Sequence, residues 1–218
     1  KPILSRLREL GHVIEVTTRE YAQTTQLADQ FGIRHQLIGK HGGSSLAGLV
    51  RENYLRSLRL AGWARSRRID LALSHNSYSQ VVAAVFLRLP AVTLMDYEHQ
   101  PLNHLCFRLA HRVIVPEAFP QEMLDKFGAL NKSRRYAGIK EQVYLAEFSP
   151  EPGFRSREDF PSDIPLIVMR PPATWAAYHR FENDLFDQLL HYLVKQPENY
   201  LLFLPRTPSQ GESVSNIP

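Results

Sequence analysis

Residues 69–84 read IDLALSHNSYSQVVAA, and this stretch decides how the chain is built. It opens with an apolar run typical of a buried strand, passes through seven polar residues from Ser74 to Gln80, and becomes apolar again. A turn needs only one or two polar residues, so a polar run of this length indicates more than a connection. The stretch predicts a strand over 69–75, a helix over 78–88 and a site where they meet.

The same alternation continues on both sides of this stretch. The apolar runs predict further strands over 12–18, 33–39, 91–97 and 111–117. The amphipathic segments predict helices over 1–10, 21–31, 46–68, 101–110 and 120–127. Strands and helices that alternate with short links are typical of a parallel sheet flanked by helices. We therefore predict an α/β fold with a doubly wound, Rossmann-like sheet, and a TIM barrel is the competing fold.

A change of character near residue 150 argues against the barrel. The segment FSPEPGFRSREDFPSDIP is rich in proline, serine and charge, which is typical of a linker. Beyond it the pattern restarts with a strand over 165–170, a helix over 181–195 and a strand over 200–205. We predict an N-terminal Rossmann-like domain over 1–147 without its first strand, a linker over 148–163, and a partial second Rossmann-like domain over 164–218. A fragment of a longer protein is expected.

Composition narrows the class of protein only slightly. The 218 residues are 44% hydrophobic, and the net charge of +4 suits phosphate-bearing molecules, an anionic membrane surface or nucleic acid about equally. The single cysteine, Cys106, falls in an expected helix, so we interpret it as a packed thiol and expect a cytoplasmic location. No apolar run approaches the roughly 20 residues that span a bilayer, and the histidines lack zinc-site spacing, so no metal site is expected.

Polar residues collect at the carboxyl ends of the expected strands, where α/β proteins bind ligands. The candidates for substrate binding are Lys40, His41, Gly42, Gly43, Asn76, Ser77 and Glu117, and the candidates for catalysis are His75, Asp96 and Glu98. The opposite strand ends are shorter and less polar. Structural turns alone would not favour one edge, so this asymmetry predicts a site.

The individual motifs leave alternatives open. KHGGSS, from Lys40 to Ser45, could hold a phosphate on backbone N–H groups, or it could be a flexible turn. His75 could donate to a sugar hydroxyl or act as an acid or base. Of the carboxylates in DYEH, one could be a general base and the other a hydroxyl acceptor; alternatively, Asp96 caps the next segment and Glu98 is solvated.

Two arginines mark the second domain. Arg170 and Arg206 follow adjacent expected strands, and guanidinium groups at one edge suit bidentate recognition of phosphate. Surface arginine is the alternative.

The helix expected over 46–68 is both apolar and basic. One face collects Leu46, Val50, Tyr54, Leu58 and Ala61, and we predict that this face is buried. Most arginines lie off it. Few aromatic residues could stack on bases, so no nucleic-acid partner is predicted, whereas peripheral membrane contact stays open.

Taken together, these motifs resemble one family. The phrases YAQTTQLADQFGI, IGKHGG, SHNSYSQ, DYEHQ, GIKEQVYLAEFSPEP, RPPATWAAYH and LPRTPSQ run over nearly all of the chain and are similar to the prokaryotic family catalogued as domain of unknown function 354. Its members resemble GT-B proteins, in which two Rossmann-like domains face each other across a cleft. Glycosyltransferases and non-hydrolysing UDP-N-acetylglucosamine 2-epimerases share that architecture. Family members usually begin with one more strand and an Asn-Ser-Pro-His loop, which this sequence lacks.

The resemblance implies an enzyme that uses a nucleotide sugar and needs no other cofactor, most simply a metal-independent glycosyltransferase. Arg170 and Arg206 would neutralise the leaving nucleotide diphosphate, and His75 or Glu98 would deprotonate a hydroxyl acceptor. The catalytic aspartate of the epimerases would fall near Asn76, whose amide cannot act as a base, so epimerisation is a weaker alternative. A non-catalytic nucleotide or glycan binder is another. A fragment should show little turnover, and the oligomeric state stays open.

Overall fold

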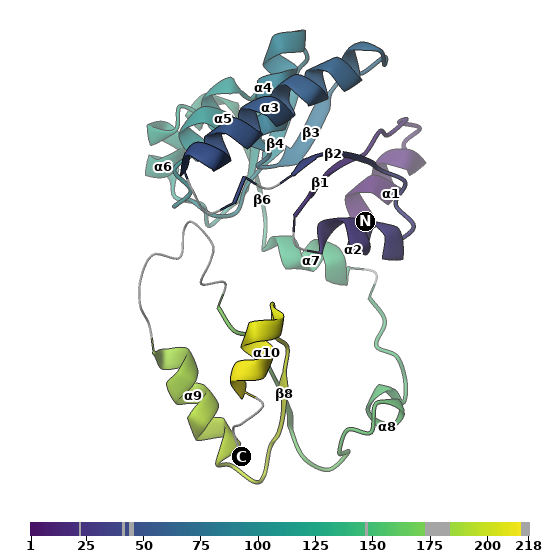
Figure 1. Ribbon diagram of the computed structural model, residues 1–218, viewed down its shortest axis with the longest axis vertical. Coiled ribbons are helices and arrows are strands. Elements are labelled where there is room, and N and C mark those ends of the chain that lie inside the picture. Colours follow the sequence, from purple (N-terminus) through teal and green to yellow (C-terminus); the bar gives the residue numbers. More distant parts are fainter. Residues whose placement is uncertain (22, 41, 44–45, 147, 173–183, 215–218) are drawn as a thin grey trace. The chain divides into compact units, whose positions relative to one another are not determined.

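The computed structural model describes residues 1–21, 23–40, 42–43, 46–146, 148–172 and 184–214 (Figure 1). The chain divides into two compact units, unit 1 (Lys1–Phe148) and unit 2 (Ser149–Pro218). Every strand pair among the described residues is parallel, and helices separate most successive strands. The α/β fold predicted from the alternation is therefore confirmed.

Unit 1 holds two parallel sheets. Its strands are β1 (Thr17–Glu20), β2 (Gln36–Lys40), β3 (Ala72–His75), β4 (Ala91–Leu94), β5 (Arg112–Pro116) and β6 (Ser133–Tyr136). Its helices are α1 (Pro2–Glu9), α2 (Thr24–Gln30), α3 (Leu46–Arg65), α4 (Tyr78–Leu87), α5 (Asn103–Leu109), α6 (Gln121–Lys126) and α7 (Lys140–Leu145), with a 3-10 turn at Leu130–Lys132. Strands β3 to β6 lie side by side in chain order, and β1 pairs with β2 in a separate sheet.

The main core lies under the larger sheet. Helices α4, α5 and α6 and strands β4 and β5 contribute side chains that are almost completely buried. Phe107 sits at its centre, 5.5 Å from the ring of Phe127 and 6.0 Å from the ring of Phe119. Cys106 is also fully buried there, and burial raises the pKa of its thiol to about 12. At neutral pH it therefore stays a packed thiol and is not a reactive thiolate.

Some boundaries differ from those expected. Strand β1 begins at Thr17, and Val13, inside the strand expected over 12–18, is 95% exposed. Strand β6 was not predicted because its sequence, SRRY, contains no apolar run. It forms because its backbone pairs with β5, and a lone sequence does not reveal such a partner.

Helix α3 buries a different face from the one expected, although Ala61 of the expected face packs against the buried cluster of Ile38, Leu60 and Ala83. Val50, Tyr54 and Leu58 are each more than 40% exposed, so the prediction that their face is buried is wrong. The polar residues Glu52 and Arg56 are buried instead. The inward face contacts β2 and α4, where several of the partners are polar groups of the strand ends and the first turn of α4. Apolar periodicity alone therefore gave the wrong side of the helix.

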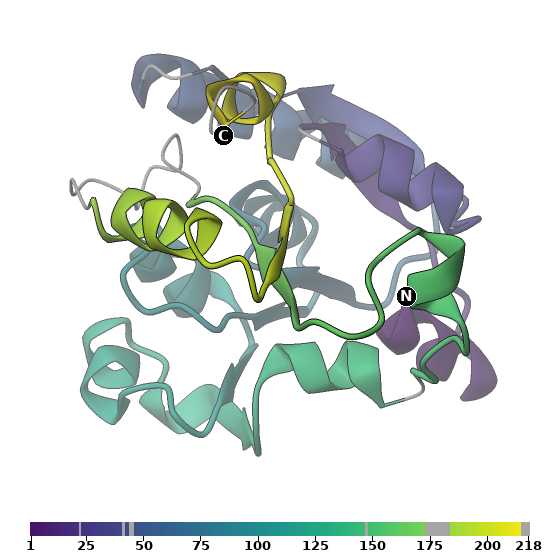
Figure 2. The same ribbon diagram turned by 90° about the horizontal axis from the view of Figure 1, so that it is seen from below.

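Unit 2 is smaller and built around one strand pair. Its strands are β7 (Leu166–Met169) and β8 (Tyr200–Phe203), and its helices are α8 (Phe154–Arg157), α9 (Leu185–Val194) and α10 (Pro208–Val214). Figure 2 shows α9 beside the two strands. The ring centroids of Phe186 in α9 and Phe203 in β8 are 6.2 Å apart. Helix α8 lies within the segment expected to be a linker. The described helices include none that is both long and apolar enough to cross a membrane.

We expect Phe107→Ala to lower the free energy of unfolding of unit 1 by about 3–5 kcal/mol, since it removes a ring from a packed core and leaves a cavity. Chemical denaturation followed by circular dichroism measures this loss. Phe86→Ala is the matched control, because Phe86 is 53% exposed and its truncation should change stability little. Equal losses in the two variants would contradict the position of this core.

Candidate functional site

The site of unit 1 forms at the carboxyl ends of β3 and β4. These strands pair in parallel with His75 opposite Leu94, so the residues that follow each strand leave the sheet side by side. His75 is the last residue of β3, and Asp96 follows β4 by two positions. Neighbouring strand ends thus bring together two of the residues predicted for catalysis.

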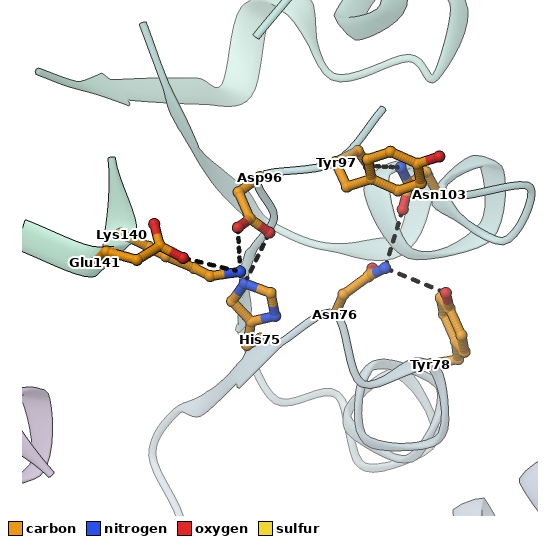
Figure 3. A network of polar contacts seen from close by, with 8 residues as sticks. All are labelled: His75, Asn76, Tyr78, Asp96, Tyr97, Asn103, Lys140 and Glu141. Carbon is orange, nitrogen blue, oxygen red and sulfur yellow. Dashed lines mark hydrogen bonds and ion pairs between the residues drawn. The ribbon is translucent and has the colours of Figure 1, made fainter. Parts of the chain in front are cut away.

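His75 forms a hydrogen bond with Asp96, and Lys140 forms an ion pair with the same carboxylate (Figure 3). His75 Nε2 lies 3.2 Å from Asp96 Oδ1, and Lys140 Nζ pairs with Asp96 Oδ2. Lys140 begins α7 and also lies 3.9 Å from a carboxylate oxygen of Glu141. The His75 side chain is 52% exposed, whereas that of Asp96 is 22% exposed. The imidazole is accordingly accessible to a ligand, and the carboxylate is the more buried of the two groups.

These contacts keep Asp96 ionised. The hydrogen bond with His75 holds the pKa of the Asp96 carboxyl well below its usual range, and the Lys140 ammonium adds to this effect while burial opposes it. Burial disfavours the Lys140 ammonium, but the hydrogen bond and charge of Asp96 outweigh burial and raise the pKa of Lys140. An ionised carboxylate only accepts hydrogen bonds, so Nε2 of His75 carries a hydrogen and Nδ1 of the neutral ring keeps a lone pair.

Asn76 anchors the loop that follows β3. Its backbone is left-handed, with φ of 51°, a conformation that asparagine tolerates better than most residues. Its Nδ2 donates to Asn103 Oδ1 at 3.0 Å and to the Tyr78 hydroxyl at 3.2 Å, and Asn103 Nδ2 donates to the Tyr97 carbonyl at 3.0 Å (Figure 3). An ionised aspartate could not donate these bonds, so the chemistry of the loop requires an amide.

The same network leaves one acceptor without a partner. Asn103 fixes the amide orientation of Asn76, because its own Nδ2 is bonded to Tyr97 and its oxygen therefore faces the Asn76 Nδ2. Asn76 Oδ1 is then buried without a hydrogen-bond partner within the described part of the chain. Burial raises the pKa of Tyr78 to about 12, so its hydroxyl stays protonated.

The other predicted residues of unit 1 make contacts of their own. Glu98 pairs with His99 at 3.5 Å between Nε2 and Oε1. Glu117 is exposed at the end of β5, where its carbonyl accepts a hydrogen bond from Arg135. Ser77 lies next to the site as the residue preceding α4.

The KHGGSS segment is described only in part. Lys40 is exposed at the end of β2, whereas His41, Ser44 and Ser45 lie outside the described residues. Gly42 is needed for packing, since a Cβ there would collide with the carbonyl of Gly48 in the first turn of α3. Its role in phosphate binding stays a prediction.

In unit 2, both predicted arginines lie at one edge of the β7–β8 pair. Arg170 follows β7 directly and is exposed. Arg206 follows β8, and its Nε donates to the Pro171 carbonyl at 2.8 Å, which ties the two strand ends together. Gln210 strengthens this link by accepting from the Arg206 backbone N–H at 3.0 Å and donating to Pro172.

Sequence reasoning missed Lys140, Asn103 and Tyr78. Lys140 follows β6, a strand that the sequence did not reveal, so its place at the sheet edge could not be inferred. Asn103 is the first residue of α5 but lies inside the helix expected over 101–110, where nothing in the sequence marks it as part of a site. Across the described ranges, no three His, Cys, Asp or Glu side chains gather in a group that could hold a metal ion.

Asp96→Asn should lower the free energy of unfolding of unit 1 by about 2 kcal/mol at pH 7, because it removes charge-assisted hydrogen bonds. The folded pKa of Asp96 is depressed, so its contribution is present above the unfolded pKa of about 3.9 and is lost as pH falls towards the folded pKa. Urea denaturation from pH 7 to pH 3 should show the difference between wild type and variant shrinking below about pH 4. Asp125→Asn, which neutralises an exposed carboxylate on α6, is the control and should show no such dependence.

The chain was compared with curated proteins and with models of protein families. A search of curated proteins finds no sequence that matches the chain. The family model described as "Protein of unknown function (DUF354)" matches residues 1–217. With nearly its whole length matched, the chain belongs to the DUF354 family.

Proposed function

We propose that this chain is part of a GT-B-type enzyme that uses a nucleotide sugar, most simply a glycosyltransferase, with His75 as the general base. The observation that carries the proposal is the His75–Asp96–Lys140 arrangement at neighbouring strand ends. A half-exposed imidazole backed by an ionised carboxylate is suited to accept a proton from a substrate hydroxyl.

In the proposed reaction, the acceptor hydroxyl loses its proton to His75 Nδ1 as its oxygen attacks the anomeric carbon of the donor sugar. The bond from that carbon to the nucleotide diphosphate breaks, and the diphosphate leaves with the electron pair. Asp96 stabilises the imidazolium that forms and fixes the ring through Nε2. Lys140 compensates the charge of Asp96 before the proton is transferred.

We assign the nucleotide diphosphate to unit 2. Arg170 and Arg206 follow paired strands whose last residues, Met169 and Phe203, are in register. Two guanidinium groups at one strand edge supply the positive charge that a leaving diphosphate needs. Arg206 donates from Nε to the Pro171 carbonyl, and its terminal nitrogens, which make no hydrogen bond within the described residues, would bind the diphosphate.

The substrate class is tested with a thermal-shift panel of UDP-, GDP- and CDP-sugars. A ligand that binds only the folded chain stabilises it in proportion to the logarithm of its concentration over Kd. We expect one nucleotide class to raise the melting temperature and Arg206→Gln to abolish that rise. A flat panel would contradict the assignment of a nucleotide sugar.

His75→Gln should lower turnover of the natural protein by about 10²- to 10⁴-fold, since the amide keeps a donor towards Asp96 but cannot take up a proton. Affinity for the stabilising nucleotide sugar should stay within about twofold. His12→Gln is the control, because His12 is an exposed histidine outside the network. Release of nucleoside diphosphate measures turnover; nucleotide-sugar binding without any release by the wild type would make the protein a binder instead.

A further inference from the structure

Arg56 is a buried arginine that joins α3 to two other elements of unit 1. The residue is 6% exposed, and its Nε donates to the Ile38 carbonyl of β2 at 2.9 Å. Its Nη1 donates to the hydroxyl of Ser77 at 3.1 Å and also to that of Ser79. Gly39, with φ of +81°, makes room for the side chain, since a Cβ there would lie only 3.0 Å from Arg56 Cγ.

The positive charge of Arg56 has no carboxylate paired with it among the described residues. Glu52 lies one helical turn earlier and is also buried, but its Oε1 accepts from Arg51 and its Oε2 has no partner in that set. The Nη2 of Arg56 likewise makes no hydrogen bond within the described ranges, although the Nε and Nη1 nitrogens are both engaged. A largely buried guanidinium that has no carboxylate paired with it among the described residues favours an anion beside it.

A second arginine adds to this charge. Burial and then the like charge of Arg19 lower the pKa of Arg56 to about 10. Strand pairing places Arg19 level with Ile38 and Gly39 of β2, the two residues that Arg56 contacts, because Thr18 pairs with Leu37 and Glu20 pairs with Lys40. Arg19 belongs to β1, stacks on Tyr21 at 4.9 Å and makes no ion pair with the carboxylates that the structure describes. Repulsion between the Arg19 and Arg56 charges costs free energy, and an anion bound between the two side chains would remove that cost.

The N-terminal end of α4 lies beside the Arg56 guanidinium. Ser77 is its N-cap residue, but no side-chain capping bond is made, and the Ser77 hydroxyl accepts from Arg56 instead. Gln80 and Val81 donate their backbone N–H groups to the Ser77 carbonyl, so within the described residues the N–H groups of Tyr78 and Ser79 are the ones available to a ligand, and the helix dipole adds positive potential there. Arg56 fixes this helix end through Ser77 and Ser79, so the donors are held in place before a ligand arrives.

We propose that Arg56, Arg19 and the first turn of α4 form a binding site for a phosphate group. Two guanidinium groups and a helix N-terminus offer more positive charge than a single carboxylate would neutralise, which favours a dianionic phosphate. The site directly follows His75 in the chain, so a phosphorylated molecule bound there would bring its other groups near the imidazole. The inference uses residues of unit 1 alone and does not depend on the proposed transfer reaction.

The test is isothermal titration calorimetry of the chain with inorganic phosphate at constant ionic strength. Arg19→Gln should weaken phosphate binding in unit 1 at least tenfold. Arg59→Gln removes the same charge from an exposed position on α3 and should change the affinity less than twofold. Arg206→Gln should leave the unit 1 binding event intact. Loss of all phosphate binding in Arg206→Gln would place the phosphate in unit 2 and overturn the inference, as would equal affinities of Arg19→Gln and Arg59→Gln.

A stability measurement separates a ligand site from a purely structural role of Arg19. In chloride buffer, Arg19→Gln should leave the melting temperature unchanged or raise it, because it relieves repulsion with Arg56. In phosphate buffer, the variant should lack the increase in melting temperature that the wild type gains. A variant that is less stable by the same amount in both buffers would show that Arg19 is structural, and the inference would then be wrong.

Discussion

A fully buried amide must have its hydrogen bonds satisfied inside the protein, and Asn103 meets this requirement by joining two loops. Its oxygen accepts from Asn76 in the loop after β3, and its Nδ2 donates to the backbone of Tyr97 in the loop after β4. The two hydrogen bonds of Asn103 thereby fix the distance between these two loops. His75 ends β3 directly before the first loop and Asp96 lies in the second loop, so we infer that their 3.2 Å contact depends on Asn103, which joins the two loops.

Strand alternation predicted the α/β fold and the edge at which polar residues collect, because both follow from local periodicity and from the geometry of parallel strands. The same geometry of parallel strands places His75 and Asp96 at one edge of the sheet, although their contact itself was not predicted. Lys140 was not predicted at that edge, since it depends on β6, whose sequence carries no strand signal and which forms only against β5. Asn103 falls inside a helix expected over 101–110 and carries no signal of its own, and only the fold shows which loops it joins.

The orientation of α3 shows where periodicity fails. Its apolar stripe predicted a buried face, yet Val50, Tyr54 and Leu58 are exposed and Arg56 is buried. Hydrophobic burial favours the first arrangement, but the polar groups presented by Ile38, Ser77 and Ser79 need a donor, and the arginine supplies several at once. A polar interior of this kind departs from local rules, as sites built to hold ligands commonly do.

The position of Lys140 also matters for how the protein is made. Helix α7 is six residues long, buries none of them completely and is the last element of unit 1, far along the chain from β3. Contacts of this kind close late, since a long loop must be ordered before they form, and short surface segments open more easily than the core. During synthesis, the core under β3 to β5 can therefore be complete while Asp96 still lacks its cation. Transient fraying of α7 in the finished protein would expose the same carboxylate to water and leave the rest of the fold in place.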